Sequence, residues 1–148
     1  MAAGRRERRL ALAREAGARI VVDAANDDIV TNVEKATSGK GADVVFEVAG
    51  TQQTFEQGLS MVHRGGTLEL VGLYEHPLSW NPSFAVSNDI TLSGCGLRFK
   101  LPGAVNLFKE GKVNAKPLIT HRFSLSDAKQ AFDAQLSAPD AIKVIVKP

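Results

Sequence analysis

The side chains able to act in acid–base, nucleophilic or metal chemistry are few and scattered. The 148 residues contain one cysteine, Cys95, and three histidines, His63, His76 and His121. No histidine has a cysteine or a carboxylate at the spacing of a metal site, so we expect loop or capping roles, with His121 the most interesting. Cys95 is expected to be a small buried hydrophobe without a redox role. The sequence therefore predicts neither a catalytic residue nor a metal ligand.

Glycines and one carboxylate mark the ends of predicted strands. Gly50 and Gly72 each close a short apolar run, and Glu47 lies just before the first of them. Gly65 and Gly66 are expected to turn the chain into the strand that ends at Gly72. A glycine at a strand end serves a tight turn, or it lets the backbone approach a ligand. Glu47 could hydrogen-bond within a cleft, and an inward carboxylate with a structural partner is at least as good an interpretation.

Strands and helices alternate through the first half of the chain. Apolar and β-branched runs predict strands at 18–24, 43–49 and 67–72. The helices between them carry apolar side chains at helical spacing, namely Ile29, Val30, Val33 and Ala36, and then Phe55, Leu59 and Val62. Asn26 or Asp27 is expected to cap the first of these helices. The short connections imply right-handed crossovers and a parallel sheet, with the strand at 43–49 covered by helices on both faces.

The second half of the chain continues with more widely spaced elements. After Gly72 we expect a loop rich in turn and aromatic residues, and then an edge strand at Asn88–Gly94. A helix is expected with Pro102 in its first turn, ending at Gly111.

The last elements are a short extended segment, a helix and a strand. Leu118 and Ile119 are expected to be extended. Ser126 is a plausible N-cap for a helix with one apolar face, formed by Ala128, Phe132 and Leu136. Ile142–Val146 alternates as a closing strand.

Length and composition fit one α/β domain spanning residues 1–148. The hydrophobic content of 44% suffices for a core, and the net charge of +2 indicates little about partners. There is no apolar run of the ~18 residues that could span a bilayer, and the N-terminus lacks a signal peptide, so no membrane association and a cytoplasmic location are expected. The lone cysteine excludes an internal disulfide.

Five segments together resemble one protein family. They are GADVVFEVAGT, GGTLELVGL, DITLSGCG, KPLITHRFSLSDAKQAFD and AIKVIVKP. Their order and spacing resemble those of zinc-type medium-chain alcohol or polyol dehydrogenases, from about Arg5 to Pro148. The resemblance implies an α/β fold with a partial, doubly wound Rossmann-type parallel sheet and flanking helices. It also implies an oxidoreductase that moves hydride between an alcohol or polyol and NAD or NADP.

The family's cofactor-binding positions can be placed on this sequence. Strand ends would lie against the cofactor, which fits the rule that open α/β sheets bind ligands at the carboxyl ends of their strands. The resemblance implies contacts to the adenosine side at Val48, Ala49 and Gly50, and a second strand end at Val71, Gly72 and Leu73. It implies backbone contacts to the nicotinamide carboxamide at Val71, Cys95 and Leu97. Lys143 matches a basic position near the pyrophosphate, where some relatives carry arginine.

Other family features have no match in these residues. There is no GxGxxG turn, and the acidic residue that holds the adenosine ribose would fall near Gly4. The family's zinc ligands and proton relay belong to another domain, so zinc is expected only there. We therefore expect cofactor binding to be weak or absent, and this chain alone to be inactive or nearly so.

In the family's sheet, with strand order 3-2-1-4-5-6, the first two strands separate the third from the fourth, and these first two have no match here. The strand at 18–24, which resembles the third, would therefore lack its ladder partners. Either the sheet closes up, a partner fills the gap, or the segment is displaced. We expect this strand and the helix before it to be the least securely placed part of the chain.

Two further questions concern assembly and the basic N-terminus. The family pairs the strand resembling Ile90–Ser93 across a twofold axis, so a homodimer with an interface around Trp80–Gly94 is expected, unless the charge of Asp89 protects the edge. The basic run of Arg5, Arg6, Arg8 and Arg9 could bind a nucleic-acid backbone or the 2′-phosphate of NADP. A solvated helix start is the favoured interpretation, without nucleic-acid binding.

The main alternative function is a free-standing, noncatalytic dimerisation or ligand-binding protein derived from this fold. The substrate and the choice between NAD and NADP are not specified by the sequence. Leu97, Arg98 and Phe99 are candidates for the border of a substrate cleft.

Overall fold

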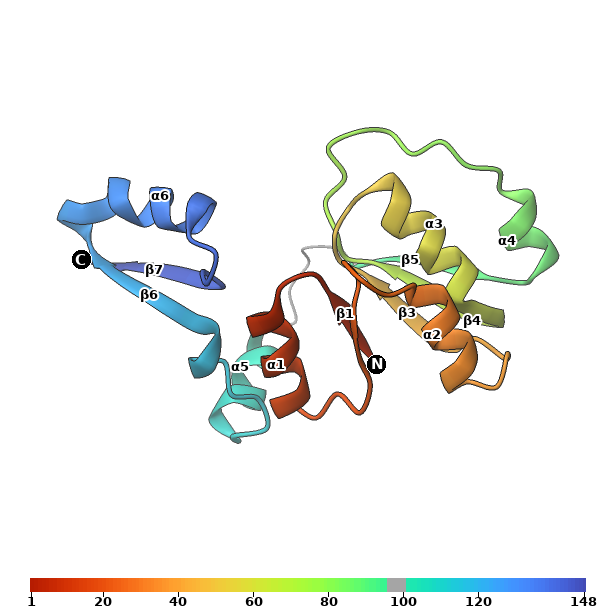
Figure 1. The fold of residues 1–148 in the computed structure, drawn as a ribbon, viewed down its shortest axis with the longest axis horizontal. Coiled ribbons are helices and arrows are strands. Elements are labelled where there is room, and N and C mark those ends of the chain that lie inside the picture. Colours follow the sequence, from red (N-terminus) through yellow and green to blue (C-terminus); the bar gives the residue numbers. More distant parts are fainter. Residues whose placement is uncertain (96–100) are drawn as a thin grey trace. The chain divides into compact units, whose positions relative to one another are not determined.

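The computed structural model describes residues 1–95 and 101–148. Within them the chain divides into two compact units, which we describe separately (Figure 1). Unit 1 comprises residues 22–95 with Met1, and unit 2 comprises residues 2–21 with 101–148. The elements alternate between strand and helix. The strands at 42–47, 62–70 and 91–94 pair in parallel, as do those at 119–124 and 143–147, which confirms the predicted α/β class. None of the helices in the described residues is long and apolar enough to cross a membrane.

Unit 1 is built on a three-stranded parallel sheet in the order β3-β4-β5. These strands are β3 (Ala42–Glu47), β4 (Val62–Leu70) and β5 (Thr91–Gly94). β4 begins five residues before the predicted strand at Thr67, so the predicted turn at Gly65 and Gly66 lies inside it. The register of β3 against β4 shifts between Ala42 and Val44, which shows that this first part of the pairing is irregular.

Helix α3 (Gln52–Met61) covers one face of this sheet. Thr51 and Thr54 form a capping box in which each side chain accepts a hydrogen bond from the other's backbone N–H, at 3.2 and 3.3 Å. The helix packs closely on β4 at Gly58, which has no side chain. A Cβ added there would lie only 2.8 Å from Leu68 Cδ1. The buried core comprises Phe55, Leu59, Val62 and Leu68. The predicted apolar stripe is therefore confirmed, although Val62 belongs to β4.

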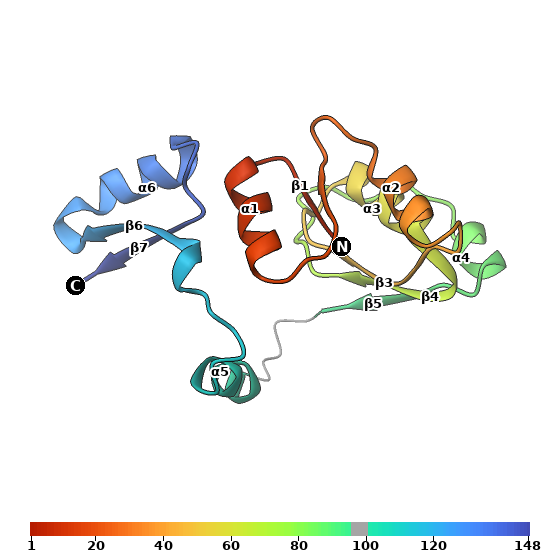
Figure 2. The same ribbon diagram turned by 60° about the horizontal axis from the view of Figure 1, so that its bottom comes forward.

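The other face of β3 is open within the described structure. Figure 2 shows α2 and α3 on the same side of the sheet. Val44, Phe46 and Val48 alternate toward the opposite side and keep 48%, 66% and 65% of their surface exposed. Within unit 1 only α3 contacts this strand extensively, so the helix cover predicted for both faces is present there on one face.

Helix α2 (Ile29–Ala36) is capped by Asp28, whose Oδ1 accepts a 2.6 Å hydrogen bond from Thr31 N. This hydrogen bond lowers the pKa of Asp28. The prediction of Asn26 or Asp27 as the cap is wrong, because the N-cap position is that of Asp28. Asn26 and Asp27 belong to the preceding turn, in which their backbone N–H groups donate to Asp23 O.

Helix α4 (Ser83–Ser87) was not predicted and lies in the segment assigned to a loop. Asn88 caps its end, with its N–H donating to Phe84 O at 3.2 Å, and Asp89 follows with φ of 55°. These two residues therefore lie before β5, which begins at Thr91 instead of Asn88.

The expected orphan strand has a ladder partner. β2 (Val21–Asp23) pairs with β1 (Ala2–Gly4) in a two-stranded sheet, and α1 (Glu7–Glu15) connects them. The expectation that this strand lacks a ladder is wrong because β1 was not recognised in the sequence. Its lower stability relative to β3 remains a prediction.

Unit 2 also contains α5 (Leu101–Lys109), the short 3-10 helix Lys116–Leu118, β6 (Ile119–Ser124) and β7 (Lys143–Lys147). β6 and β7 pair in parallel, and α6 (Ala128–Ser137) lies between them in the sequence. Gly111 follows α5 with φ of 68°, as expected of a helix stop. Leu118 is in a 3-10 turn and not extended, whereas Ile119 begins β6.

The predicted cap of α6 is wrong, and the predicted apolar residues Phe132 and Leu136 are largely exposed. Ser126 lies in a 3-10 turn, where its hydroxyl is 2.6 Å from Ser124 Oγ, and Asp127 occupies the N-cap position. Phe132 and Leu136 are 71% and 83% exposed, and the covered residue is Ala131. The helix packs against β6 and β7. Phe132 borders a groove with Ala131, Val144 and Val146 while most of its own surface stays exposed.

Candidate functional site

The carboxyl ends of three strands lie in register at one edge of the unit 1 sheet. Glu47 of β3 pairs with Leu70 of β4, and Leu70 pairs with Gly94 of β5. Leu70 O also accepts a 2.9 Å hydrogen bond from Cys95 N. The segments predicted to bind a cofactor follow directly after these pairs, so the sheet brings Val48, Ala49 and Gly50 together with Val71, Gly72, Leu73 and Cys95.

Glu47 is the centre of this edge, and only 3% of its surface is exposed. Its Oε1 accepts hydrogen bonds from Ala49 N at 2.7 Å, Gly50 N at 2.9 Å and Thr54 Oγ1 at 2.8 Å. Its Oε2 accepts one from the Tyr74 hydroxyl. The carboxylate thus joins the end of β3, the first turn of α3 and the loop after β4.

The main chain of Glu47 strengthens the same junction. Its carbonyl oxygen accepts hydrogen bonds from Val71 N at 2.8 Å and Gly72 N at 3.0 Å. The backbone after β4 is therefore attached to the backbone of β3 beyond the last ladder pair.

These contacts shift the pKa values of the two ionisable partners in opposite directions. Burial raises the pKa of Glu47, but the hydrogen bonds from Tyr74, Thr54, Gly50 and Ala49 outweigh burial and hold this pKa below its usual value. Burial, followed by the hydrogen bond to Glu47 and its charge, raises the pKa of Tyr74 far above the usual value. At neutral pH the Glu47 side chain is therefore an ionised carboxylate, and it accepts a hydrogen bond from the neutral Tyr74 hydroxyl.

Gly50 and Gly72 lie with their backbones against each other. A Cβ at Gly50 would lie 2.3 Å from Leu73 O, and a Cβ at Gly72 would lie 2.4 Å from Gly50 N. Gly50 also has φ of 71°, a conformation that favours glycine. Backbone packing accounts for both glycines, as in the simpler of the two sequence interpretations.

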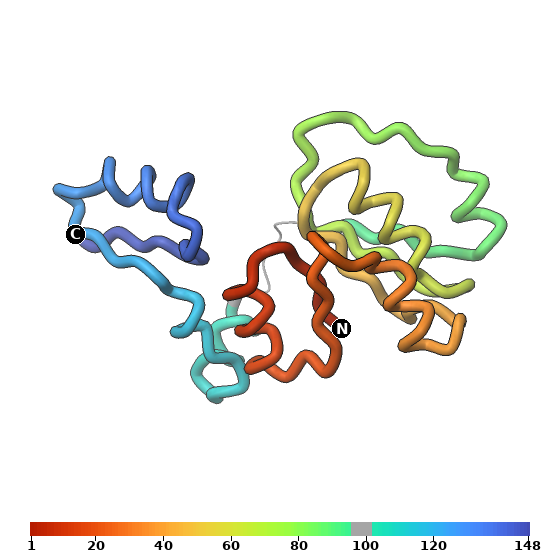
Figure 3. The backbone as a smooth tube through the Cα atoms, viewed as in Figure 1, coloured from red at the N-terminus to blue at the C-terminus, as the bar shows by residue number. Residues whose placement is uncertain are grey.

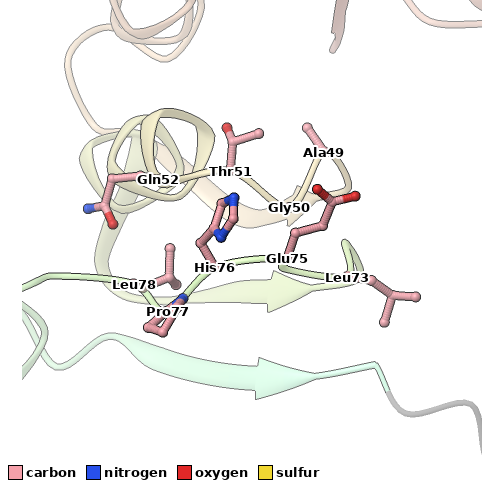
Figure 4. Close-up of a pocket in the computed structure, with 9 residues that line it drawn as sticks. All are labelled: Ala49, Gly50, Thr51, Gln52, Leu73, Glu75, His76, Pro77 and Leu78. Atoms are coloured by element: carbon pink, nitrogen blue, oxygen red, sulfur yellow. The ribbon is translucent and has the colours of Figure 1, made fainter.

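A pocket of about 360 Å³ adjoins this junction. It is lined by Ala49, Gly50, Thr51, Gln52, Leu73, Glu75, His76, Pro77 and Leu78. Figure 4 shows Glu75 and His76 directed toward the strand-end segment at Gly50 and Thr51, and the Leu73 side chain directed away. The volume lies within the usual range for ligand sites.

The loop that forms one wall of the pocket is attached to α3 as well as to β3. The Gln52 amide donates to Ser79 O at 2.7 Å and accepts from Ser79 N at 2.9 Å. Farther along, Trp80 meets the Phe55 ring edge-on, with ring centroids 5.4 Å apart. Figure 3 shows the length of this loop between β4 and α4.

Two of the predicted cofactor-binding residues belong to other parts of the chain than the unit 1 residues described above. Lys143 is exposed at the start of β7 in unit 2. Leu97 lies outside the described residues, as do Arg98 and Phe99. Cys95 is exposed, so the prediction of a buried cysteine is wrong, because β5 ends at Gly94 and its carboxyl end faces away from the core.

The histidines have structural contacts or line the pocket. His63 Nε2 lies 3.0 Å from Asp43 Oδ1, and His121 in β6 stacks on Phe123 with ring centroids 6.3 Å apart. In the described part of the chain, no group of three or more histidine, cysteine or acidic side chains could hold a metal ion. These residues therefore do not fit a zinc site.

The basic N-terminal run has contacts within unit 2. Arg6 donates to Ala141 O at 3.2 Å, and Arg8 pairs with Asp140 at 3.1 Å. Arg8 lies in the first turn of α1 and its side chain is half exposed, as the interpretation of this run as a solvated helix start predicts.

Sequence analysis missed Tyr74 and Thr54, the two side chains that bind the Glu47 carboxylate. Thr54 carries a detectable signal, because Thr51 and Thr54 have the spacing of a helix cap. Tyr74 is the only tyrosine of the chain, and it lies 27 residues beyond Glu47 with no local pattern that links them.

Comparison with known proteins shows that most of the chain matches one protein family. Residues 1–110 match the family described as zinc-binding dehydrogenases. An alcohol dehydrogenase from Cupriavidus necator is 34% identical over 148 residues, covering 96% of this chain and 40% of that protein.

Solved structures give the same result. The 2R,3R-butanediol dehydrogenase of Bacillus subtilis has a TM-score of 0.86 and 29% identity, covering 99% of this chain and 42% of that one. A protein from Sinorhizobium meliloti 1021, described as a zinc-binding dehydrogenase bound to NADP, has a TM-score of 0.88 and 26% identity, covering 99% and 44%.

The chain spans about two fifths of the length of the relatives it matches. The matched residues include every element of the strand-end junction described above. The chain belongs to the zinc-binding dehydrogenase family and corresponds to the carboxyl-terminal, cofactor-binding part of its members.

Proposed function

We propose that this chain is the cofactor-binding portion of a zinc-type NAD(P)-dependent alcohol or polyol dehydrogenase. The observation that supports the proposal most directly is the alignment of the carboxyl ends of β3, β4 and β5 at one edge of a parallel sheet. Ligands of open α/β sheets bind at such edges. The adjoining pocket is lined in part by Ala49, which has a small side chain, and by Gly50, which has none. A nucleotide could therefore approach the backbone closely there.

Each strand end has a separate task in this proposal. Val48, Ala49 and Gly50 contact the adenosine side, while backbone groups of Val71 and Cys95 orient the nicotinamide carboxamide. The bound nicotinamide supplies the chemistry of hydride transfer. The residues of this chain hold the ring and exclude water from the strand ends. NAD and NADP both remain candidates, and the NADP complex of the S. meliloti relative supports the second.

In this proposal the zinc chemistry belongs to another domain of the family's members. Since the described side chains contain no group that could hold the metal, we expect this chain alone to oxidise alcohols and diols immeasurably slowly.

The proposal is tested by titrating cofactor fragments into the ¹⁵N-labelled chain and following amide chemical shifts. AMP should shift the amides of Val48 to Gly50, whereas nicotinamide mononucleotide should shift those of Val71 to Leu73 and Cys95. Amides of α6 serve as the internal control. Absence of shifts at the strand ends with either intact dinucleotide at ~10 mM would contradict the proposal for this chain.

The alternative of a noncatalytic dimerisation protein is favoured by one observation, the edge strand β5. In the described sheet, β5 pairs only with β4, so its other edge is available to a second copy. We propose a homodimer that pairs Ile90–Ser93 with itself. The Arg64–Asp89 ion pair at 3.3 Å partly offsets the charge that would protect this edge.

Dimerisation is checked by sedimentation velocity on the chain and on Leu92→Pro, which removes a backbone donor in β5. We expect a dimer for the first and a monomer for the second. A chain that sediments as a monomer at about 100 μM would refute the proposed interface, since stable dimers associate well below this concentration.

A further inference from the structure

We infer that Tyr74 and Glu47 are positioning residues that together fix the backbone of Val71–Leu73 and the adjoining pocket wall. The hydrogen bond between their side chains is called the Glu47–Tyr74 pin below. The pin itself concerns the conformation of this chain, and only its effect on cofactor affinity rests on the proposed function.

The loop after β4 is attached at both ends of the pocket wall. At one end, the Tyr74 hydroxyl donates to the buried Glu47 carboxylate. At the other end, the Gln52 side-chain amide donates to the Ser79 carbonyl oxygen at 2.7 Å and accepts from the Ser79 backbone N–H at 2.9 Å. Residues 75–78 between these points line the pocket. Their position therefore depends on both attachments.

The pin is coupled directly to the strand ends. The same glutamate that accepts from Tyr74 also holds Ala49 N and Gly50 N with its carboxylate and Val71 N and Gly72 N with its carbonyl oxygen. Because Glu47 is buried, its carboxylate has no ready replacement donor from solvent. Loss of the Tyr74 hydroxyl would make the carboxylate shift or admit water, and the attached backbone would move with it.

The aromatic ring and the hydroxyl of Tyr74 have separable roles. The ring packs against the core formed by Phe55, Leu59, Val62 and Leu68, whereas the hydroxyl reaches Glu47. Tyr74→Phe therefore removes the pin and retains the packing. Glu47→Gln removes the charge from the same bond, and Leu59→Met is a matched control that perturbs the core without touching the pin.

Amide hydrogen exchange measured by NMR tests the positioning role. We expect Tyr74→Phe to raise exchange about tenfold at Val71–Leu73 and at the amides of the pocket wall, with the ladder amides of β3 and β4 unchanged. Leu59→Met should change exchange throughout unit 1 without this local pattern. If Tyr74→Phe alters exchange no more at Val71–Leu73 than Leu59→Met does, the positioning role is wrong.

A spectroscopic measurement tests the bond itself. Tyr74 is the only tyrosine, so the alkaline absorbance titration of the folded chain reports on this residue alone. In Glu47→Gln the midpoint should fall toward the usual tyrosine value of about 10, because the charge of Glu47 is gone. An unchanged midpoint in a folded Glu47→Gln would show that the pin is absent in solution.

The effect on cofactor binding is measured last. We expect Tyr74→Phe to bind NAD(H) or NADP(H) about tenfold more weakly, because fewer molecules hold the binding conformation, while Leu59→Met binds as the original chain does. Equal affinity in Tyr74→Phe would overturn the link from the pin to binding. If the original chain binds neither cofactor, the proposed function fails, and the exchange and absorbance results still decide the pin.

Discussion

Replacing Phe55 by alanine should lower the free energy of unfolding of unit 1 by about 3–5 kcal/mol. Phe55 is 1% exposed, lies on the inner face of α3 and meets Trp80 edge-on. Removing its ring leaves a cavity between α3 and the sheet that Leu68 and Leu59 cannot fill without moving the backbone. Urea denaturation followed by far-ultraviolet circular dichroism measures the change, with the fluorescence of the only tryptophan as a second probe.

Phe46→Ala is the control for this prediction. It deletes the same ring from the neighbouring strand of the same unit, but Phe46 is 66% exposed. The expected loss is within about 0.5 kcal/mol. Equal losses for the two variants would mean that the α3 face is not the core of unit 1.

Gly50→Ala should be the most damaging of the glycine substitutions, at about 2–5 kcal/mol. It combines the cost of a left-handed conformation, about 1–2 kcal/mol, with the overlap of its Cβ and Leu73 O, about 1–3 kcal/mol. Gly72→Ala should show the overlap alone, because its Cβ would lie 2.4 Å from Gly50 N and its φ is not positive. Thermal and urea unfolding of these two variants, and of the two glycine variants in the next paragraph, provide the measurement.

Two other glycines separate the two costs. Gly65 has φ of 80° with no atom within 4 Å of an added Cβ, so Gly65→Ala should show the conformational cost alone. Gly94 has neither feature, so Gly94→Ala should leave stability nearly unchanged. If Gly72→Ala were as mild as Gly94→Ala, the two backbones could not lie in the contact described.

The alternation of strands and helices could be predicted because each element carries its own period of apolar residues. This holds for α3, where Phe55 and Leu59 lie four positions apart and both are buried. The coverage of β3 could not be predicted in the same way. A nearly continuous apolar run is typical of a strand buried on both faces, but the packing of Val44 and Phe46 depends on which other segments reach them.

Local polar competition explains the errors at helix starts. Several adjacent acidic or amide residues precede α2, and the turn at Asp23 engages Asn26 and Asp27, so Asp28 remains to cap the helix. At α6 the apolar pattern included Phe132, which is 71% exposed, whereas the buried residue of the helix is Ala131.

The candidate site could be predicted at the level of strand ends but not of side chains. Glycines after apolar runs mark Gly50 and Gly72, and parallel pairing brings such ends to one edge. The link from Glu47 to Tyr74 spans 27 residues and depends on how the loop after β4 folds back. No periodicity or turn signal encodes such a contact, although the need of a buried carboxylate for donors indicates that partners must exist.

The mutual contact of Gly50 and Gly72 also governs how these positions can vary in evolution or in a mutant library. A side chain at Gly72 would meet Gly50 N, and one at Gly50 would meet Leu73 O, directly after Gly72, so each displaces the same two backbone segments. The steric parts of the two costs are therefore coupled, whereas the conformational cost at Gly50 stays whichever residue is at position 72. A library that samples each position separately would miss this coupling.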